Sequence, residues 1–235
     1  MSERAFVAGA TGYVGREVVR DLRDRGIETT AHIRPQSRSV ERWRASFAAM
    51  GATVDETPWE LDAITATIAR LEPTLVFALL GTTRKRAKAE SIDNPYEAID
   101  YGLTAMLFSA AATLANPAPR FIYLSAAGVS ERSSSAYMAA RWRAESLISA
   151  GPLPYVLARP AIITGADRDD ARPGERLAGG VADAALSVLG AFGARGLRDR
   201  YRSTTNVTLA AALVRWALDP EAKAKIAEGA DLRGR

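Results

Sequence analysis

The chain has 235 residues, of which 48% are hydrophobic and 25% charged, and its formal net charge is only +4. This length and composition are those of one folded α/β domain, and they exclude global disorder. The absence of cysteine excludes disulfide bonds, thiolate metal sites and cysteine nucleophiles, and the single histidine, His32, argues against a zinc site, so no metal is expected.

The predicted elements of the first half alternate between strands and helices. Residues 4–9 form a short apolar run that ends in a glycine turn, and a helical pattern follows over 13–25. The apolar stretch 27–33 predicts a second strand. The remaining elements of this half are a helix over 39–50, a strand over 52–55, a helix over 61–71 and a buried strand over 75–80.

The second half continues the alternation and then loosens. A helix over 96–114, a buried strand over 121–125, a helix over 136–149 and a strand over 155–159 are expected. This order predicts an α/β fold with a doubly wound parallel sheet, the Rossmann fold, in a single domain over 1–235. Residues from about 160 to 235 are expected to add a small substrate or lid region. It contains a charged loop, an apolar helix over 177–194 and a last helix over 207–218.

The segment Gly9-Ala10-Thr11-Gly12-Tyr13-Val14-Gly15 lies between the first expected strand and the first expected helix. Glycines at such a turn let the backbone approach a pyrophosphate, which the N-terminal N–H groups of the helix then bind. We therefore expect a dinucleotide site here, the alternative being a glycine-rich turn that binds nothing. The candidate cofactor-binding residues of the turn are Gly9, Thr11, Gly12, Tyr13, Val14 and Gly15.

The end of the second strand indicates which dinucleotide is bound. An NAD site has an acidic residue there, which binds the adenosine ribose. This chain has Arg34 at that place, followed by Ser37 and Arg38. Cations and a hydroxyl suit a 2′-phosphate, so Arg34 and Arg38 favour NADP(H) over NAD as the cofactor.

The glycine turn, Ser125 at the end of a buried strand and the segment Tyr137-Met-Ala-Ala-Arg141 together resemble the short-chain dehydrogenase/reductase superfamily. The G-x-x-G-x-x-G spacing is similar to that of its extended and atypical branches. Leu80-Gly81-Thr82-Thr83-Arg84, Arg159-Pro160 and Arg172-Pro173-Gly174-Glu175 resemble atypical members of the Tat-interacting-protein-like or NmrA-like kind. The resemblance runs from about residue 4 to residue 233.

The resemblance implies hydride transfer between a nicotinamide and a carbonyl or alcohol. It adds two groups of cofactor-binding positions, one after the strand over 75–80 and one after the strand over 155–159, where family members hold the carboxamide with backbone groups. An ordinary strand exit stopped by proline is the alternative for the second group. The added positions are Leu80, Gly81, Thr82, Pro160, Ile162 and Ile163.

The resemblance also implies a catalytic set of serine, tyrosine and lysine. Ser125 and Tyr137 match the first two, and both are also expected to serve as ordinary packing or capping residues if the catalytic interpretation is wrong. The lysine position holds Arg141, which the resemblance places at the cofactor together with Tyr137. Residues four apart share one helix face, so Arg141 can act at the same site. Arginine does not readily release a proton, so we expect cofactor binding to persist and turnover to be weakened or absent.

Three functions remain open at this point. The first is an NADP(H)-dependent oxidoreductase acting on a small carbonyl or alcohol, with a pocket roofed by the apolar helix over 177–194. The second is a redox sensor or scaffold protein that binds NADP(H) without turnover, which Arg141 favours. The third is an isomerase or epimerase that uses held cofactor transiently, although no sugar-nucleotide signature is visible.

The expected partners follow from charge and hydropathy. Basic residues are spread along the chain, so no nucleic-acid partner is expected, and Arg84-Lys85-Arg86 is interpreted as a solvated cluster or an anion contact. The apolar segment 177–194 contains Asp183 and four glycines, so a buried helix is favoured over a membrane span. No secretion signal is recognised, which favours the cytoplasm. A homodimer through an apolar helix face stays open.

Overall fold

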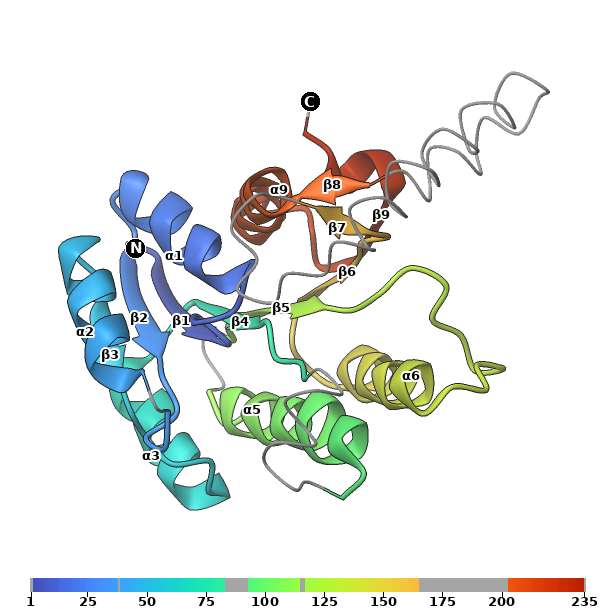
Figure 1. Cartoon of the computed structure of the whole chain (residues 1–235), viewed down its shortest axis with the longest axis horizontal. Coiled ribbons are helices and arrows are strands. Elements are labelled where there is room, and N and C mark those ends of the chain that lie inside the picture. The colour runs from blue at the N-terminus through green and yellow to red at the C-terminus, as the bar shows by residue number, and fades with distance from the viewer. Residues whose placement is uncertain (1, 38, 83–92, 115–116, 165–202, 235) are drawn as a thin grey trace.

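A parallel sheet of seven strands, in the order β3-β2-β1-β4-β5-β6-β9, forms the centre of the protein (Figure 1). The computed structural model describes residues 2–37, 39–82, 93–114, 117–164 and 203–234. The strands are β1 (Arg4–Ala8), β2 (Glu28–His32), β3 (Thr53–Asp55), β4 (Leu75–Ala78), β5 (Arg120–Leu124), β6 (Tyr155–Arg159) and β9 (Ala224–Glu228). Two short strands, β7 (Ile163–Thr164) and β8 (Thr204–Thr205), pair separately.

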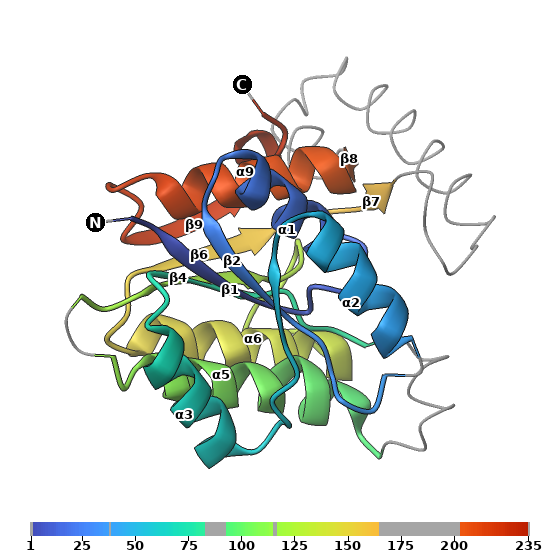
Figure 2. The same ribbon diagram turned by 90° about the vertical axis from the view of Figure 1, so that its left-hand side faces the viewer.

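Helices cover both faces of the sheet (Figure 2). One face carries α1 (Gly15–Asp24), α2 (Val40–Ala49) and α9 (Asn206–Leu218). The other carries α3 (Leu61–Leu71), α5 (Thr104–Ala111) and α6 (Ala136–Ala150). A π-helix, η1 (Tyr96–Leu103), runs directly into α5, and a 3₁₀ turn, η2 (Gly229–Leu232), follows β9. The α/β doubly wound architecture expected from the sequence is therefore confirmed.

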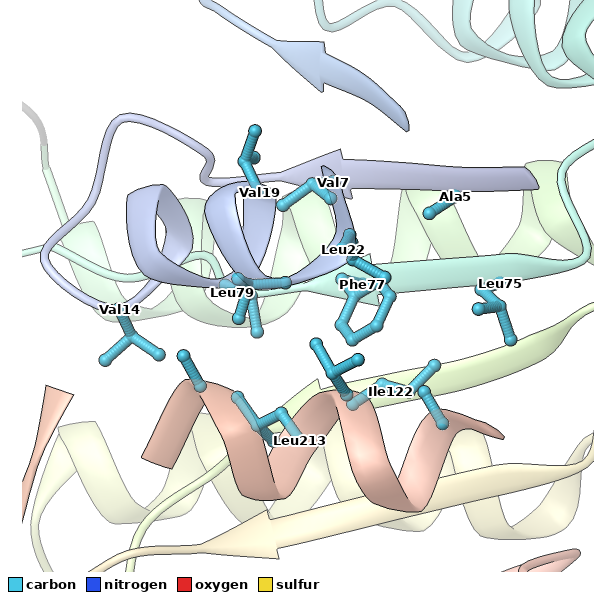
Figure 3. Close-up of a cluster of buried hydrophobic side chains, with 14 of the residues drawn as sticks. Ala5, Val7, Val14, Val19, Leu22, Leu75, Phe77, Leu79, Ile122 and Leu213 are labelled. Carbon is cyan, nitrogen blue, oxygen red and sulfur yellow. The ribbon is translucent and has the colours of Figure 1, made fainter. Parts of the chain in front are cut away.

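Alternation along the central strands sends successive side chains to opposite faces. On β4, Leu75 and Phe77 enter the core beneath α1 and α9, whereas Val76 and Ala78 enter the core beneath α5 and α6. Strands buried on both faces carry continuous apolar runs, which explains why this segment shows no polar alternation. Figure 3 shows Phe77 in the first core, among side chains from α1, β1, β5 and α9.

The structure differs from the expected elements in two places. The strand β9 (Ala224–Glu228) was not predicted: it pairs with β6 at the sheet edge, where Ile226 is 45% exposed, so its sequence lacks the apolar run of a covered strand. The expected helix over 96–114 begins as the π-helix η1 and becomes α-helical at Thr104. The spacing of apolar residues does not distinguish a π-helix from an α-helix in the same segment.

Part of the expected C-terminal region lies outside the described residues. This applies to the apolar helix over 177–194 and to the charged loop before it, so the substrate or lid region stays a prediction there. The last expected helix, over 207–218, is α9. Among the helices in the described ranges, none combines the length and the apolar character needed to cross a membrane.

The core around Phe77 predicts a large stability difference between two truncations. Phe77 is fully buried, so Phe77→Ala leaves a cavity and should lower the free energy of unfolding by about 3–5 kcal/mol. Leu61→Ala, at a residue 51% exposed, should change it by less than about 0.5 kcal/mol. Urea unfolding of both variants measures the difference, and equal losses would contradict this assignment of the core.

Candidate functional site

The glycine turn closes tightly between β1 and α1. Gly9 has a φ of +80°, and a methyl group added there would overlap the carbonyl group of Leu79. The amide of Gly12 donates to the carbonyl of Gly9 at 2.9 Å. A methyl group on Gly15 would overlap that same carbonyl, so a side chain at either end would force the turn open.

The start of α1 is not capped by a side chain of its own segment. Val14 occupies the N-cap position without a side-chain hydrogen bond and is itself buried in the core, while Thr11 is half-buried. Uncapped N–H groups at a helix start suit an anionic group. The carbonyl of Tyr13 accepts a hydrogen bond of 3.3 Å from Asn206 Nδ2, at the start of α9. Asn206 was missed by the sequence reasoning, because nothing local relates residues so far apart in the chain.

The exit of β2 forms a turn next to the glycine turn, because β2 pairs with β1 in parallel. Arg34 is half-buried, and its carbonyl accepts a hydrogen bond of 3.0 Å from the amide of Ser37. Ser37 Oγ in turn accepts a hydrogen bond of 3.4 Å from the amide of Ser39. Arg38 lies outside the described residues. The predicted 2′-phosphate ligand Arg34 therefore stands at the carboxyl edge of the sheet.

A buried histidine lies below this turn. His32 Nε2 is 2.8 Å from the carbonyl oxygen of Thr57, and its ring meets the edge of Trp59 with centroids 4.8 Å apart. Asp55 Oδ2 is 4.0 Å from the ring nitrogen, and Arg70 is 3.7 Å from Asp55 on the outer side. Burial lowers the pKa of His32, against the opposing influence of the Thr57 carbonyl and Asp55. The folded protein thus favours neutral His32.

The exit of β4 contacts the π-helix. Leu80 is buried, Gly81 is exposed, and the amide of Thr82 donates to Asp100 Oδ2 at 3.3 Å. A methyl group on Gly81 would lie 3.0 Å from Arg141 Nη2. Leu80, Gly81 and Thr82, the positions that the resemblance implies, therefore lie directly over the buried ion pair of Arg141 and Asp100.

Ser125 is a buried hydroxyl at the exit of β5. Its amide donates to the carbonyl of Ala158 on β6 at 2.7 Å. The residue is 4% exposed, and its Oγ is a buried atom with no hydrogen-bond partner among the residues that the structure describes. Buried hydroxyls are nearly always hydrogen-bonded, so an unsatisfied one at the carboxyl edge of a sheet has the character of a ligand-binding group.

Tyr137 lies in the first turn of α6, which Ser135 caps by accepting a hydrogen bond of 3.1 Å from the amide of Met138. Its half-buried ring meets the edge of Tyr96, with centroids 5.4 Å apart. The guanidinium carbon of Arg141 is 5.1 Å from the Tyr137 ring centroid. The predicted tyrosine and arginine therefore share one face of α6.

The guanidinium of Arg141 is buried and bonded to the protein itself. Its Nη1 donates to the carbonyl of Leu124, and its Nη2 donates to the carbonyl of Leu80 at 3.2 Å. Nη2 also donates to Asp100 Oδ1 at 2.7 Å. Burial raises the pKa of Asp100, and the positive charge of Arg141 opposes this rise. Both terminal nitrogens thus have protein acceptors, an arrangement that spacing along α6 did not reveal.

Tyr123 lies beside Arg141 and Asp100, on the face of the sheet that α5 and α6 cover. Its hydroxyl is 3.5 Å from Arg141 Nη1, and burial raises the pKa of Tyr123 to about 12. Tyr123 is fully buried and serves the core, whereas Tyr137 is only half-buried.

The exit of β6 is held by backbone bonds and by a second charged cluster. The carbonyl of Pro160 accepts from the amide of Ala127 at 2.8 Å, and the carbonyl of Ile162 accepts from Thr204 at 3.0 Å. Ile163 begins the short strand β7. Arg159, at the end of β6, binds Glu145 of α6 with Nε–Oε1 at 2.9 Å, and Glu228 of β9 at 3.0 Å. The sequence reasoning missed this cluster.

Apart from Tyr137 and Arg141 on α6, the described site residues thus come from strand exits that are neighbours in the sheet. Sheet order places the exits of β2, β1, β4, β5 and β6 side by side, and all of them point to the same carboxyl edge. Arg141 joins the β4 exit to the β5 exit directly. In open parallel sheets, ligands bind along this edge, where the strand order reverses beside β1.

Comparison with known protein families also points to a dinucleotide-binding fold. A family model described as NAD(P)H-binding matches residues 9–189. A search of curated protein sequences finds no match.

Three solved structures share the fold at low identity. UDP-glucuronic acid 4-epimerase from Bacillus cereus, in complex with UDP-glucuronic acid and NAD, is 14% identical with a TM-score of 0.67, over 96% of this chain and 77% of that one. A Bacillus halodurans protein described as an NAD-dependent epimerase/dehydratase is 16% identical with a TM-score of 0.67, over 96% and 92%. Acetoin dehydrogenase from Enterobacter cloacae is 16% identical with a TM-score of 0.64, over 100% and 97%.

The buried histidine predicts how stability depends on pH between about 7.5 and 5.5. Because the pKa of folded His32 is lowered, the unfolded chain takes up a proton below about pH 6.5 that the folded chain does not. The contribution of His32 is present above that pH and is lost on acidification, by at most about 1.4 kcal/mol per pH unit.

Urea unfolding across this range tests the role of His32. The variant His32→Gln keeps an N–H group for the carbonyl of Thr57 and removes the titration, so its free energy of unfolding should vary less with pH. Since His32 is the only histidine in the chain, an unchanged pH slope in the variant would show that another group is responsible.

Proposed function

We propose that this chain, which belongs to a family described as NAD(P)H-binding, is an atypical short-chain dehydrogenase/reductase. It would act as an NADP(H)-dependent oxidoreductase on a small carbonyl or alcohol. The observation that carries the proposal is the unsatisfied Ser125 hydroxyl, buried at the same sheet edge as the glycine turn. A buried hydroxyl at this edge is available to bind the oxygen of a carbonyl or alcohol substrate.

The glycine turn fits a dinucleotide. Methyl groups at Gly9 or Gly15 would overlap backbone carbonyls, so the backbone there is as close-packed as a pyrophosphate site requires. No side chain caps the start of α1, where the amides of Arg16 and Glu17 donate to the carbonyls of Gly12 and Val14 at 3.2 and 3.1 Å. The positive end of the helix dipole at this point favours a phosphate group. We assign Gly9, Gly12 and Gly15 to this role.

The β2 exit favours NADP(H) over NAD. A half-buried arginine stands where an NAD site needs a carboxylate, and the carbonyl of Arg34 is tied back to Ser37. A guanidinium forms strong charge-assisted hydrogen bonds with a phosphate group. This arrangement supports a 2′-phosphate contact from Arg34.

Two side chains are assigned to the chemistry. A bound nicotinamide supplies or accepts the hydride. The Ser125 hydroxyl donates a hydrogen bond to the substrate oxygen, and the Tyr137 hydroxyl gives its proton to that oxygen in reduction or takes it back in oxidation. Tyr137 suits this role because it is half-buried on the helix that follows the Ser125 exit.

Arg141 is the reason to expect slow turnover. Its terminal nitrogens donate to Leu80, Leu124 and Asp100, and a guanidinium does not release a proton in proteins. The chain therefore lacks a proton carrier at this position. The same observation favours a second candidate, in which the protein binds NADP(H) as a redox sensor or scaffold without turnover.

Calorimetric titration of cofactor-stripped protein with NADPH and NADH tests the cofactor assignment. The variant Arg34→Glu removes a charge-assisted bond worth about 1.5–3 kcal/mol, so NADPH affinity should fall about 10- to 100-fold and NADH affinity should change little. Arg25→Glu, at the far end of α1, is the control and should leave both affinities near wild type. Equal losses for the two cofactors would refute the 2′-phosphate contact.

Tyr137→Phe separates the enzyme from the sensor. Loss of a general acid should reduce NADPH oxidation with a carbonyl panel at least about 100-fold, while the NADPH dissociation constant stays within about threefold. Tyr155→Phe, at the start of β6 and thus at the opposite sheet edge, serves as the control. If wild-type protein binds NADPH tightly but no carbonyl compound is reduced, the sensor is the correct function.

A further inference from the structure

Asp100 is a carboxylate held in the interior by the π-helix. The residue is 0% exposed, and both carboxylate oxygens have donors: Oδ1 faces Arg141 Nη2 at 2.7 Å, and Oδ2 faces the Thr82 amide at 3.3 Å. Its backbone carbonyl accepts from Thr104 Oγ1 at 2.9 Å. A helix with π winding is rare and often marks a functional position.

Arg141 approaches the same point from α6. Its guanidinium also donates to the carbonyls of Leu80, two residues beyond β4, and of Leu124, the last residue of β5. The pair therefore joins two strand exits, η1 and α6 through one set of charge-assisted bonds. Such bonds are shorter and stronger than neutral ones, and the guanidinium fork fixes their direction.

The pair also sets the space above it. A methyl group on Gly81 would lie 3.0 Å from Arg141 Nη2 and 3.5 Å from Asp100 Oδ1, so the Gly81 backbone rests on the ion pair. Leu124 is the residue before Ser125, whose unsatisfied hydroxyl marks the site. The β4 exit, which is expected to bind the cofactor, and the β5 exit, which carries Ser125, are thus both bonded to the pair.

We propose that Asp100 and Arg141 are positioning residues that hold the Leu80–Thr82 and Leu124–Ser125 exits at the spacing required for the cofactor. On this assignment Arg141 holds the backbone carbonyls beneath the site in place. Its positive charge is balanced by Asp100 and does not bind a ligand directly. The inference rests on the proposed function for the identity of the ligand. It differs from that function in giving a role to Asp100, which neither the motifs nor the family comparison assigns.

The experiment compares Asp100→Asn, Arg141→Met and the double variant with wild-type protein. NADPH affinity is measured by calorimetry well below the unfolding temperature of each variant. Amide hydrogen exchange is measured without cofactor at Thr82, Ser125 and Ala127. We expect each single variant to weaken NADPH binding at least about tenfold and to speed exchange at these amides. The double variant should bind like Arg141→Met alone, because the two residues act as a unit.

Arg120→Met is the matched control for a merely structural effect. Arg120 also donates to two backbone carbonyls, those of Ala217 and Pro220, but at the start of β5 on the opposite edge of the sheet. It should lower the unfolding temperature and leave NADPH affinity within about twofold of wild type. Thr104→Val removes only the hydroxyl bond to the backbone carbonyl of Asp100, within the turn that positions this residue, and covers the case in which a charge-removing variant fails to fold. It should weaken NADPH binding to a smaller degree than Asp100→Asn.

The outcomes are separable from those of the proposed function. Affinity and exchange that match wild type in Asp100→Asn and Thr104→Val would overturn the positioning role, as would losses in affinity that multiply in the double variant. If wild-type protein does not bind NADPH at all, the proposed function fails. The exchange comparison then still decides whether the pair holds the two strand exits.

Discussion

The buried positive charge of Arg141 is the constraint on which the carboxyl edge of the sheet depends. A guanidinium keeps its proton, so a protein that buries one must surround it with acceptors or lose several kcal/mol of stability. Leu80 and Leu124 supply carbonyl oxygens, and Asp100 supplies the balancing charge. The exits of β4 and β5, η1 and α6 must all be in place before the two terminal nitrogens of Arg141 have these acceptors, which makes their relative positions a single cooperative feature.

A second polar anchor one helical turn further along extends this arrangement. Glu145 of α6 is 2% exposed and binds Arg159 at the end of β6, which also binds Glu228 on β9. Apolar residues such as Ala144 and Ile148 lie on the same helix and pack into the core. Helix α6 is therefore attached to the sheet by oriented polar bonds near the candidate site and by apolar packing beyond it. The polar bonds fix the orientation of α6 at the end of the helix that faces the candidate site.

Sequence periodicity predicted most of the fold because its strongest signals are local. The helix α3 and the strand β6 have their expected bounds, since Pro73 and Pro160 end their segments clearly. The edge strand β9 was missed because one side of it faces solvent. The π-helix was missed because the hydropathy pattern does not distinguish π-helical from α-helical winding. The glycine turn could be recognised from spacing, but the partner of Arg141 could not, since Asp100 lies 41 residues away and only the sheet brings the two together.

The contact between Asn206 and Tyr13 has a consequence for how the protein becomes functional during synthesis. These residues are 193 positions apart, and α9 packs on α1 over the same face of the sheet. The glycine turn is synthesised before α9, yet α9 supplies a contact to it. Domains generally fold as units, and such non-local contacts form late. A nascent chain that stalls before α9 would therefore carry the glycine turn without the α9 side chains that pack around it.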